Sequence, residues 1–127
     1  MKLINAPDAP PAVGPYSHAA RVGNLLLCSG QIPICPTEKK IIAHDIDSQT
    51  SQVFENIKAV LKSQGLSLKN IAKTTVFLQS MDDFVRMNAV YDEEFQGHKP
   101  ARSTVEVAKL PLGALVEIEC IAAFPEP

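Results

Sequence analysis

The sequence predicts an α+β fold in one domain, residues 1–127, with one β-sheet and two helices on one of its faces. Its length is about that of one domain, and a hydrophobic content of 46% with a charged content of 20% is typical of a globular protein. Two segments repeat apolar residues at the helical period, and several short runs are β-branched or alternate in polarity. Because two helices cover only one face of such a sheet, the other face is expected to be uncovered.

The first half of the chain contains the first predicted strands and the first helix. Residues 1–12 are rich in proline and form an extended lead-in. Residues 16–33 form two short strands separated by Gly23-Asn24, a two-residue turn signal. Residues 39–43 form a short third strand. Residues 45–65 form a helix, because their apolar residues recur with a period close to 3.6.

The second half continues with a strand, a helix and two more strands. Residues 71–79 form a β-branched strand, residues 80–95 a helix, and residues 101–107 and 115–122 two alternating strands. The apolar face of the second helix includes Asn88. A buried amide needs hydrogen-bond partners, so Asn88 is expected to reach a strand or loop beneath the helix. The alternative is a partly exposed residue at the helix margin.

The last two strands carry an unusual set of polar residues. Successive side chains of a strand point to opposite faces, so Val105 and Val107 are assigned to the core face. The residues expected on the uncovered face are Arg102, Thr104, Glu106, Leu115, Glu117, Glu119 and Ile121. A face of this mixed polarity is better explained by packing against other copies of the chain than by contact with water. The sequence therefore predicts a homo-oligomer.

Three features of these strands and of an earlier turn suggest a binding site. The guanidinium group of Arg102 can donate two parallel hydrogen bonds to a small carboxylate. Glu117 can orient a water molecule or move a proton if burial raises its pKa. The turn at 29–31, Ser-Gly-Gln, offers small residues and backbone N–H groups. A plain ion pair between Arg102 and Glu117 is the alternative.

The distance between Arg102 and Glu117 bears on that alternative. If the last two strands form a simple hairpin about Leu112, the two side chains lie about 17 Å apart along the strands. They would then meet only across a subunit interface.

Composition argues against several other classes of protein. The net charge is −2 and there is no basic run, so nucleic acid is not an expected partner. Cys28, Cys35 and Cys120 form no C-x-x-C pair and are expected to be free thiols, and the three histidines show no metal-ligand spacing. No apolar run is long enough to span a membrane and no signal peptide is recognisable, so a cytoplasmic protein without a metal is expected.

Six segments of the chain form a recognisable pattern: "GPYSHA" at 14–19, "CSGQIP" at 28–33, "KTTVFL" at 73–78, "MNAVYDEEF" at 87–95, "PARSTVEVAKLP" at 100–111 and "VEIECIA" at 116–122. Through these segments, the chain resembles the RidA/YjgF family of imine deaminases over nearly its whole length. The resemblance implies a chorismate-mutase-like (RidA-like) fold with a mixed sheet. It also implies a homotrimer, in which the sheets form a central barrel, the helices lie outside and three pockets lie between subunits.

The resemblance also implies roles for individual residues. By motif, Arg102 matches the arginine that binds the substrate carboxylate, and Glu117 matches the glutamate that assists water attack. The residues that match those lining or supporting the pocket are Tyr16, Ser29, Gly30 and Asn88. Thr104 stands where many bacterial enzymes have cysteine, and its hydroxyl can hydrogen-bond water or ligand but does not readily form a thiolate-like anion.

Three functions are compatible with this resemblance. The first is hydrolysis of 2-imino acids and their enamine tautomers, such as 2-iminobutanoate and 2-aminoacrylate, to 2-keto acids and ammonia, without a cofactor. The second is a non-catalytic trimer that binds 2-keto acids or regulates a partner. The third, an endoribonuclease or translation inhibitor, is disfavoured because there is no basic stripe and no histidine pair for RNA cleavage.

Overall fold

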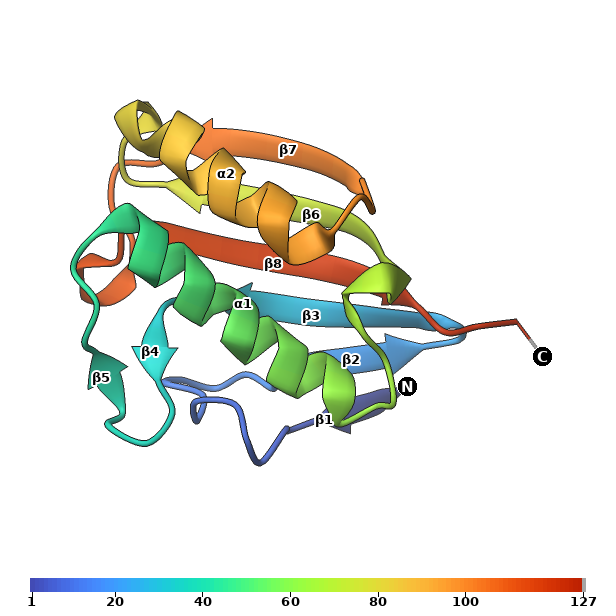
Figure 1. The fold of residues 1–127 in the computed structure, drawn as a ribbon. Coiled ribbons are helices and arrows are strands. Elements are labelled where there is room, and N and C mark those ends of the chain that lie inside the picture. Colours follow the sequence, from blue (N-terminus) through green and yellow to red (C-terminus); the bar gives the residue numbers. More distant parts are fainter. Residues whose placement is uncertain (127) are drawn as a thin grey trace.

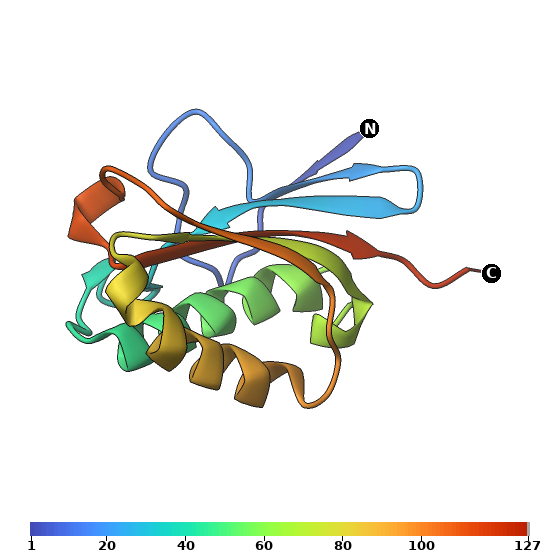
Figure 2. The same cartoon turned by 90° about the horizontal axis from the view of Figure 1, so that it is seen from above.

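The computed structural model describes residues 1–126 and shows the predicted α+β architecture, with both helices on one face of the main sheet (Figure 1 and Figure 2). The sheet has six strands in the order β1-β2-β3-β8-β6-β7. These strands are β1 (Lys2–Ile4), β2 (Ala19–Val22), β3 (Leu25–Gln31), β6 (Ile71–Leu78), β7 (Ala101–Glu106) and β8 (Val116–Ala123). The remaining elements are the hairpin β4 (Ile34–Cys35) and β5 (Lys40–Ile41), the helices α1 (Ile46–Lys62) and α2 (Phe84–Phe95), and the 3₁₀ turns η1 (Leu68–Asn70), η2 (Met81–Asp83) and η3 (Pro111–Gly113).

The core lies between the two helices and the sheet. On α1, Val53, Phe54 and Leu61 are completely buried, and they pack with Val76 of β6 and Ile118 of β8 in one apolar cluster. Burying a side chain of this size stabilises the fold by about 1.5–3 kcal/mol. The apolar period of α1 therefore identifies the covered face of the sheet correctly.

The last two strands do not form the hairpin considered from the sequence. β6 lies between β7 and β8, pairing with β7 in parallel and with β8 antiparallel. The cause is helix α2, which connects β6 to β7. A strand–helix–strand connection of this kind returns the chain parallel to its first strand, so β7 takes the free edge of β6. The chain then passes through η3 to reach β8 on the other side of β6.

The faces predicted for β7 are also wrong, whereas those predicted for β8 are confirmed. On β7, Arg102 and Thr104 stand beside Thr74 and Val76, which are buried beneath the helices, and Val105 is 43% exposed on the open face. An edge strand under the polar margin of one helix needs few apolar residues on its covered side. The alternation of residues along β7 therefore divides its side chains between two faces, but it does not show which face the helices cover.

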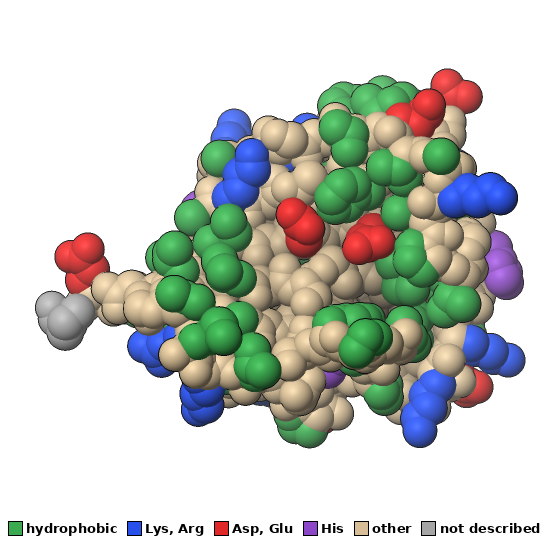
Figure 3. Space-filling model, turned by 180° about the vertical axis from the view of Figure 1, so that it is seen from behind, with side chains coloured by type: hydrophobic (Ala, Val, Ile, Leu, Met, Phe, Trp, Pro, Cys, Tyr) green, Lys and Arg blue, Asp and Glu red, His purple; other side chains and the backbone are tan. Residues whose placement is uncertain are grey.

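The open face of the sheet is apolar around an acidic centre. Acidic side chains lie near the middle of this face, and apolar side chains surround them (Figure 3). The register places on this face the exposed residues Leu3, Val22, Leu25, Leu27 and Val105. Among residues 1–126, no helix has both the length and the apolar content needed to cross a bilayer.

Candidate active site

Arg102 lies on the edge strand β7 beneath helix α2. Its Nη1 donates a hydrogen bond to Oδ1 of Asn88, at 2.8 Å. Its guanidinium carbon lies 4.7 Å from the ring centre of Tyr91 and 5.7 Å from that of Phe84. Asn88 thus reaches the strand beneath its helix, as the sequence predicted, and it is half-buried there.

These contacts hold the guanidinium group of Arg102 without neutralising it. Asn88 is uncharged, and none of the ion pairs within residues 1–126 involves Arg102. The Tyr91 hydroxyl lies 2.7 Å from Oγ1 of Thr74, and burial is the main reason why the pKa of Tyr91 is raised. The phenol therefore stays neutral near physiological pH. The positive charge of Arg102 and its remaining N–H donors are left available to an anion.

A hollow of about 470 Å³ opens beside Arg102. Its walls come from the second half of α2 and from the segment 98–102 that leads into β7. The volume is typical of a pocket for a small molecule. The lining of this hollow combines the guanidinium group of Arg102 with the rings of Tyr91 and Phe95 and the acidic side chain of Asp92.

Thr104 lies two residues further along β7, on the same face as Arg102. Its Oγ1 is buried and has no hydrogen-bond partner among residues 1–126. Leaving a buried hydroxyl unpaired costs about 1–3 kcal/mol, so such a group marks a position where a ligand or water is expected. This unpaired oxygen supports the sequence-based assignment of Thr104 to a binding site.

Glu117 lies on β8 and points to the open face of the sheet, beside Phe77 of β6. The pKa of its carboxyl group is raised, first by burial and then by repulsion from Glu119. A carboxyl group with a raised pKa can accept and return a proton closer to neutral pH than an exposed one can.

Glu117→Gln is expected to stabilise the fold at neutral pH and to have no effect on stability in acid. Because the folded state raises the pKa of Glu117, folding disfavours the charged carboxylate, and this cost is fully present above the folded pKa. The cost disappears as the pH falls below the ordinary value of 4.5, where the group is protonated in both states. Denaturant midpoints of the wild type and of Glu117→Gln, at neutral pH and below pH 4.5, measure this effect. An equal difference between the two proteins at both pH values would contradict a raised pKa of Glu117.

Gly30 permits the position of the Glu117 carboxyl group. A Cβ atom at residue 30 would overlap Oε2 of Glu117 and lie 2.9 Å from its Cδ. Real Cβ atoms do not approach other atoms this closely, so only glycine fits without displacing the carboxyl group.

A second hollow, also of about 470 Å³, lies in front of Gly30 and Glu117. Tyr16 and Ser29, which the resemblance assigns to the pocket, contribute to the wall of this hollow. The prediction that the turn offers free N–H groups is wrong for Ser29, whose N–H donates to the carbonyl oxygen of His18 at 2.9 Å. The Ser29 hydroxyl donates to the carbonyl oxygen of Ser17 at 2.6 Å. The N–H and the hydroxyl of Ser29 therefore both hydrogen-bond to the segment that leads into β2.

His18 is a positioning residue that sequence reasoning did not identify. It is 4% exposed, its Nδ1 accepts a hydrogen bond from the Ala6 N–H at 2.9 Å, and its Nε2 donates to the Pro10 carbonyl oxygen at 2.7 Å. These bonds fix one tautomer and tie the N-terminal segment to the chain beside Tyr16. An isolated histidine without ligand spacing gives no signal of such a role in the sequence.

His18→Ala is therefore expected to lower the free energy of unfolding by about 1–3 kcal/mol for each backbone group left unpaired. His18→Gln should recover most of this loss, because an amide also has one acceptor and one donor group. Urea denaturation of the three proteins measures the effect. Equal destabilisation by alanine and glutamine would show that the imidazole ring acts through packing rather than through its two hydrogen bonds.

The two halves of the candidate site lie on opposite faces of the sheet. Arg102 faces α2 and stands in the row with Thr74 and Cys120, whereas Glu117 faces away from the helices in the row with Phe77 and Val105. The two residues cannot share a pocket within one subunit, and the reason is this opposition of faces rather than the hairpin spacing predicted from the sequence. No group of three or more His, Cys, Asp or Glu side chains within residues 1–126 could hold a metal ion.

The sequence and the fold both match known proteins. A family model described as Endoribonuclease L-PSP matches residues 6–124. The chain belongs to this family. The resemblance to RidA/YjgF proteins is thereby confirmed. A RutC family protein of Pyrococcus horikoshii is 50% identical over 121 residues, which are 95% of this chain and 96% of that protein.

Solved structures of this L-PSP (RidA/YjgF) family superpose closely on the chain. YyfA of the Rid protein family from Yersinia pestis has a TM-score of 0.93 and 46% identity, covering 96% of this chain and 98% of its own. Escherichia coli TdcF, solved with bound serine, has a TM-score of 0.93 and 40% identity, covering 98% of this chain and 100% of its own. The mixed sheet with two helices on one face is therefore the fold of this family.

Proposed function

We propose that this protein is a hydrolase that converts 2-imino acids, and their enamine tautomers such as 2-aminoacrylate, to 2-keto acids and ammonia. The observation that carries the proposal is the chemistry of two groups: the guanidinium of Arg102, held by uncharged partners, and the carboxyl of Glu117, whose pKa is raised. The guanidinium group can bind the carboxylate of the substrate, and the carboxyl group can take a proton from the water that attacks the imine. TdcF with bound serine supports a small amino-acid-like ligand in this fold.

The proposed site is complete only in an oligomer. Arg102 and Glu117 lie on opposite faces of one sheet, so the Arg102 edge of one subunit must approach the Glu117 hollow of another. The open face has the exposed apolar residues that such an interface buries. In the homotrimer that we propose, the three sheets form a chorismate-mutase-like barrel and the helices lie outside. Cyclic symmetry repeats the same contact and gives three equal pockets.

In the proposed reaction, Arg102 binds the carboxylate of a protonated imine and the Thr104 hydroxyl contacts the ligand or its water. Glu117 accepts a proton from water as the oxygen attacks the imine carbon, giving a tetrahedral aminoalcohol. The protonated Glu117 then gives its proton to the nitrogen, the C–N bond breaks with its electron pair leaving on ammonia, and the hydroxyl group loses its proton to the Glu117 carboxylate as the 2-keto acid forms. A protonated imine is already electrophilic, so orientation of the water and the carboxylate is the main task of the protein.

A non-catalytic trimer that binds 2-keto acids is the second candidate. The hollow beside Arg102 supports it, because Arg102 lines this hollow and Glu117 does not. The two candidates therefore differ in their dependence on Glu117.

A coupled assay distinguishes the candidates. Threonine dehydratase generates 2-iminobutanoate in the presence of semicarbazide, which traps the imine, and this protein is added in catalytic amounts. We expect the wild-type protein to suppress semicarbazone formation and Glu117→Gln to be about 100-fold less effective, the usual contribution of a general base. Light scattering reports whether both proteins are trimers. Binding of 2-ketobutyrate without suppression would favour the second candidate, and a monomer would overturn the shared site.

A further inference from the structure

Cys28 and Cys120 face each other across two neighbouring strands. They are direct register partners in the antiparallel pair β3–β8, and both point to the face covered by α1. Directly opposed residues of an antiparallel pair have Cα atoms about 4.5–5.5 Å apart. A disulfide requires a Cα separation of about 4.4–6.8 Å, so the register of these strands places the two cysteines within the backbone range that a disulfide needs.

The two thiols interact and differ in exposure. Cys28 is half-buried, whereas Cys120 is 3% exposed and packs in the core. The pKa of the Cys28 thiol is lowered, chiefly by its interaction with the neighbouring Cys120 thiol. That same interaction, together with burial, raises the pKa of the Cys120 thiol well above its usual value. Cys28 is therefore both the more accessible and the more readily ionised thiol of the pair.

We propose that Cys28 and Cys120 are a thiol–disulfide site, which a hydroperoxide such as hydrogen peroxide converts to an intramolecular disulfide in the folded protein. The Cys28 thiolate attacks one peroxide oxygen, the O–O bond breaks, and a sulfenic acid and water form. The Cys120 sulfur then attacks the sulfenic sulfur, the S–O bond breaks, and a second water leaves with the Cys120 proton. Two thiols are oxidised to one disulfide and one peroxide is reduced to two waters.

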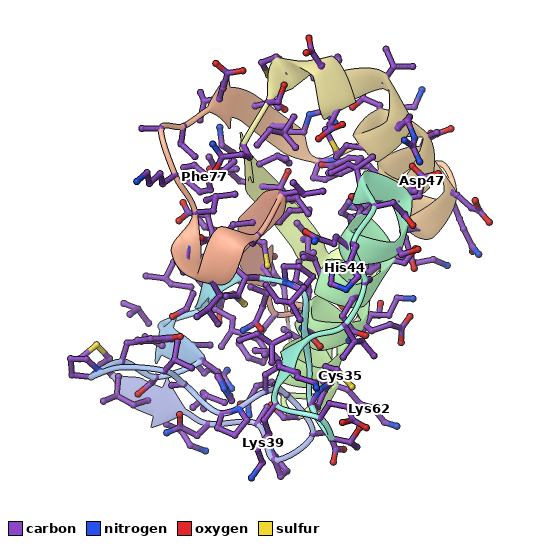
Figure 4. All side chains as sticks on the ribbon, turned by 90° about the vertical axis from the view of Figure 1, so that its left-hand side faces the viewer. Cys35, Lys39, His44, Asp47, Lys62 and Phe77 are labelled. Carbon is purple, nitrogen blue, oxygen red and sulfur yellow. The ribbon has the colours of Figure 1, made fainter. Side chains whose placement is uncertain are left out.

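This site is separate from the proposed imine site and does not depend on the proposed function. The row across the sheet runs from Cys28 to Cys120, Thr74 and Arg102, so Thr74 separates the thiols from the guanidinium group. The third cysteine, Cys35, belongs to the small β4–β5 hairpin outside the main sheet, and it provides an internal control (Figure 4).

The test is chemical mapping of thiols in the whole folded protein. The native chain is treated with hydrogen peroxide, quenched with catalase, unfolded, and alkylated with N-ethylmaleimide before mass spectrometry. We expect oxidation to yield one peptide pair joining Cys28 to Cys120, a bond that removes two hydrogen atoms from the chain. Cys35, whose pKa is lowered chiefly by its hydrogen bond with Thr37, should lie outside this cross-link whether it is alkylated or oxidised by itself. Cys35→Ser should give the same cross-link, whereas Cys28→Ser and Cys120→Ala should give none.

Several outcomes would overturn the proposal. They are three alkylated cysteines after oxidation, a sulfinic acid at Cys28 with Cys120 still alkylated, and a cross-link that includes Cys35. The Cys28→Ser variant guards against misfolding of the Cys120→Ala variant, because the half-buried position tolerates serine more readily than the core does. Circular dichroism of each variant before oxidation establishes that the fold is retained.

Discussion

Replacing Arg102 with lysine is expected to lower kcat/KM for imine hydrolysis about 100-fold, a loss of about 2.7 kcal/mol of transition-state stabilisation. Lysine retains the positive charge but not the planar pair of donors. It cannot donate to Asn88 and to a substrate carboxylate in the same fixed geometry. Steady-state kinetics with the semicarbazide trap measure the effect, and thermal unfolding should change little because the contact serves the ligand.

Arg86→Lys is the matched control for this substitution. Arg86 lies on α2, and its Nε pairs with the exposed Asp47 at 3.0 Å rather than with Asn88. The control should retain wild-type kcat/KM. If Arg102→Lys did so as well, the assignment of Arg102 to the carboxylate would be wrong.

Asn88→Asp tests the same contact from the other side. Asn88 accepts a hydrogen bond from Arg102 while adding no charge, so it orients the guanidinium group and leaves its charge for the substrate. An aspartate at this position would form an ion pair with Arg102 and compete with the substrate carboxylate. The expected result is a raised KM, whereas a purely structural role of Asn88 would leave KM unchanged.

Gly30→Ala is expected to reduce kcat about as much as Glu117→Gln does, by about 100-fold. The added methyl group would occupy the space of Glu117 Oε2, so the carboxyl group must rotate away from the hollow. The φ of Gly30 is not in the left-handed region, so the backbone itself accepts alanine and the effect acts through Glu117. Single-turnover kinetics of the variant measure this loss.

A double-mutant cycle gives the control for Gly30→Ala. In a Glu117→Ala background there is no carboxyl group to displace, so adding Gly30→Ala should not reduce kcat further. A further loss in that background would show that the methyl group acts on another part of the pocket, and the proposed link between Gly30 and Glu117 would fail.

The sequence by itself determined the local elements and the family. The 3.6-residue apolar period located α1, the same period placed Asn88 on the inner side of α2, and the segments around Arg102 and Glu117 identified the family. These features depend on residues close together in the chain, whose preferences are expressed locally. The position of α1, the side of α2 that carries Asn88 and the family motifs can therefore be predicted from the sequence alone.

The tertiary structure alone decided which residues meet across the sheet. It placed β6 between β7 and β8, which turned Arg102 toward α2 and left Glu117 on the open face. It also set Gly30 beneath Glu117 and Cys28 opposite Cys120. The physical reason is that strand alternation defines two faces without saying which is covered, and pairing partners are chosen by contacts between residues far apart in the sequence.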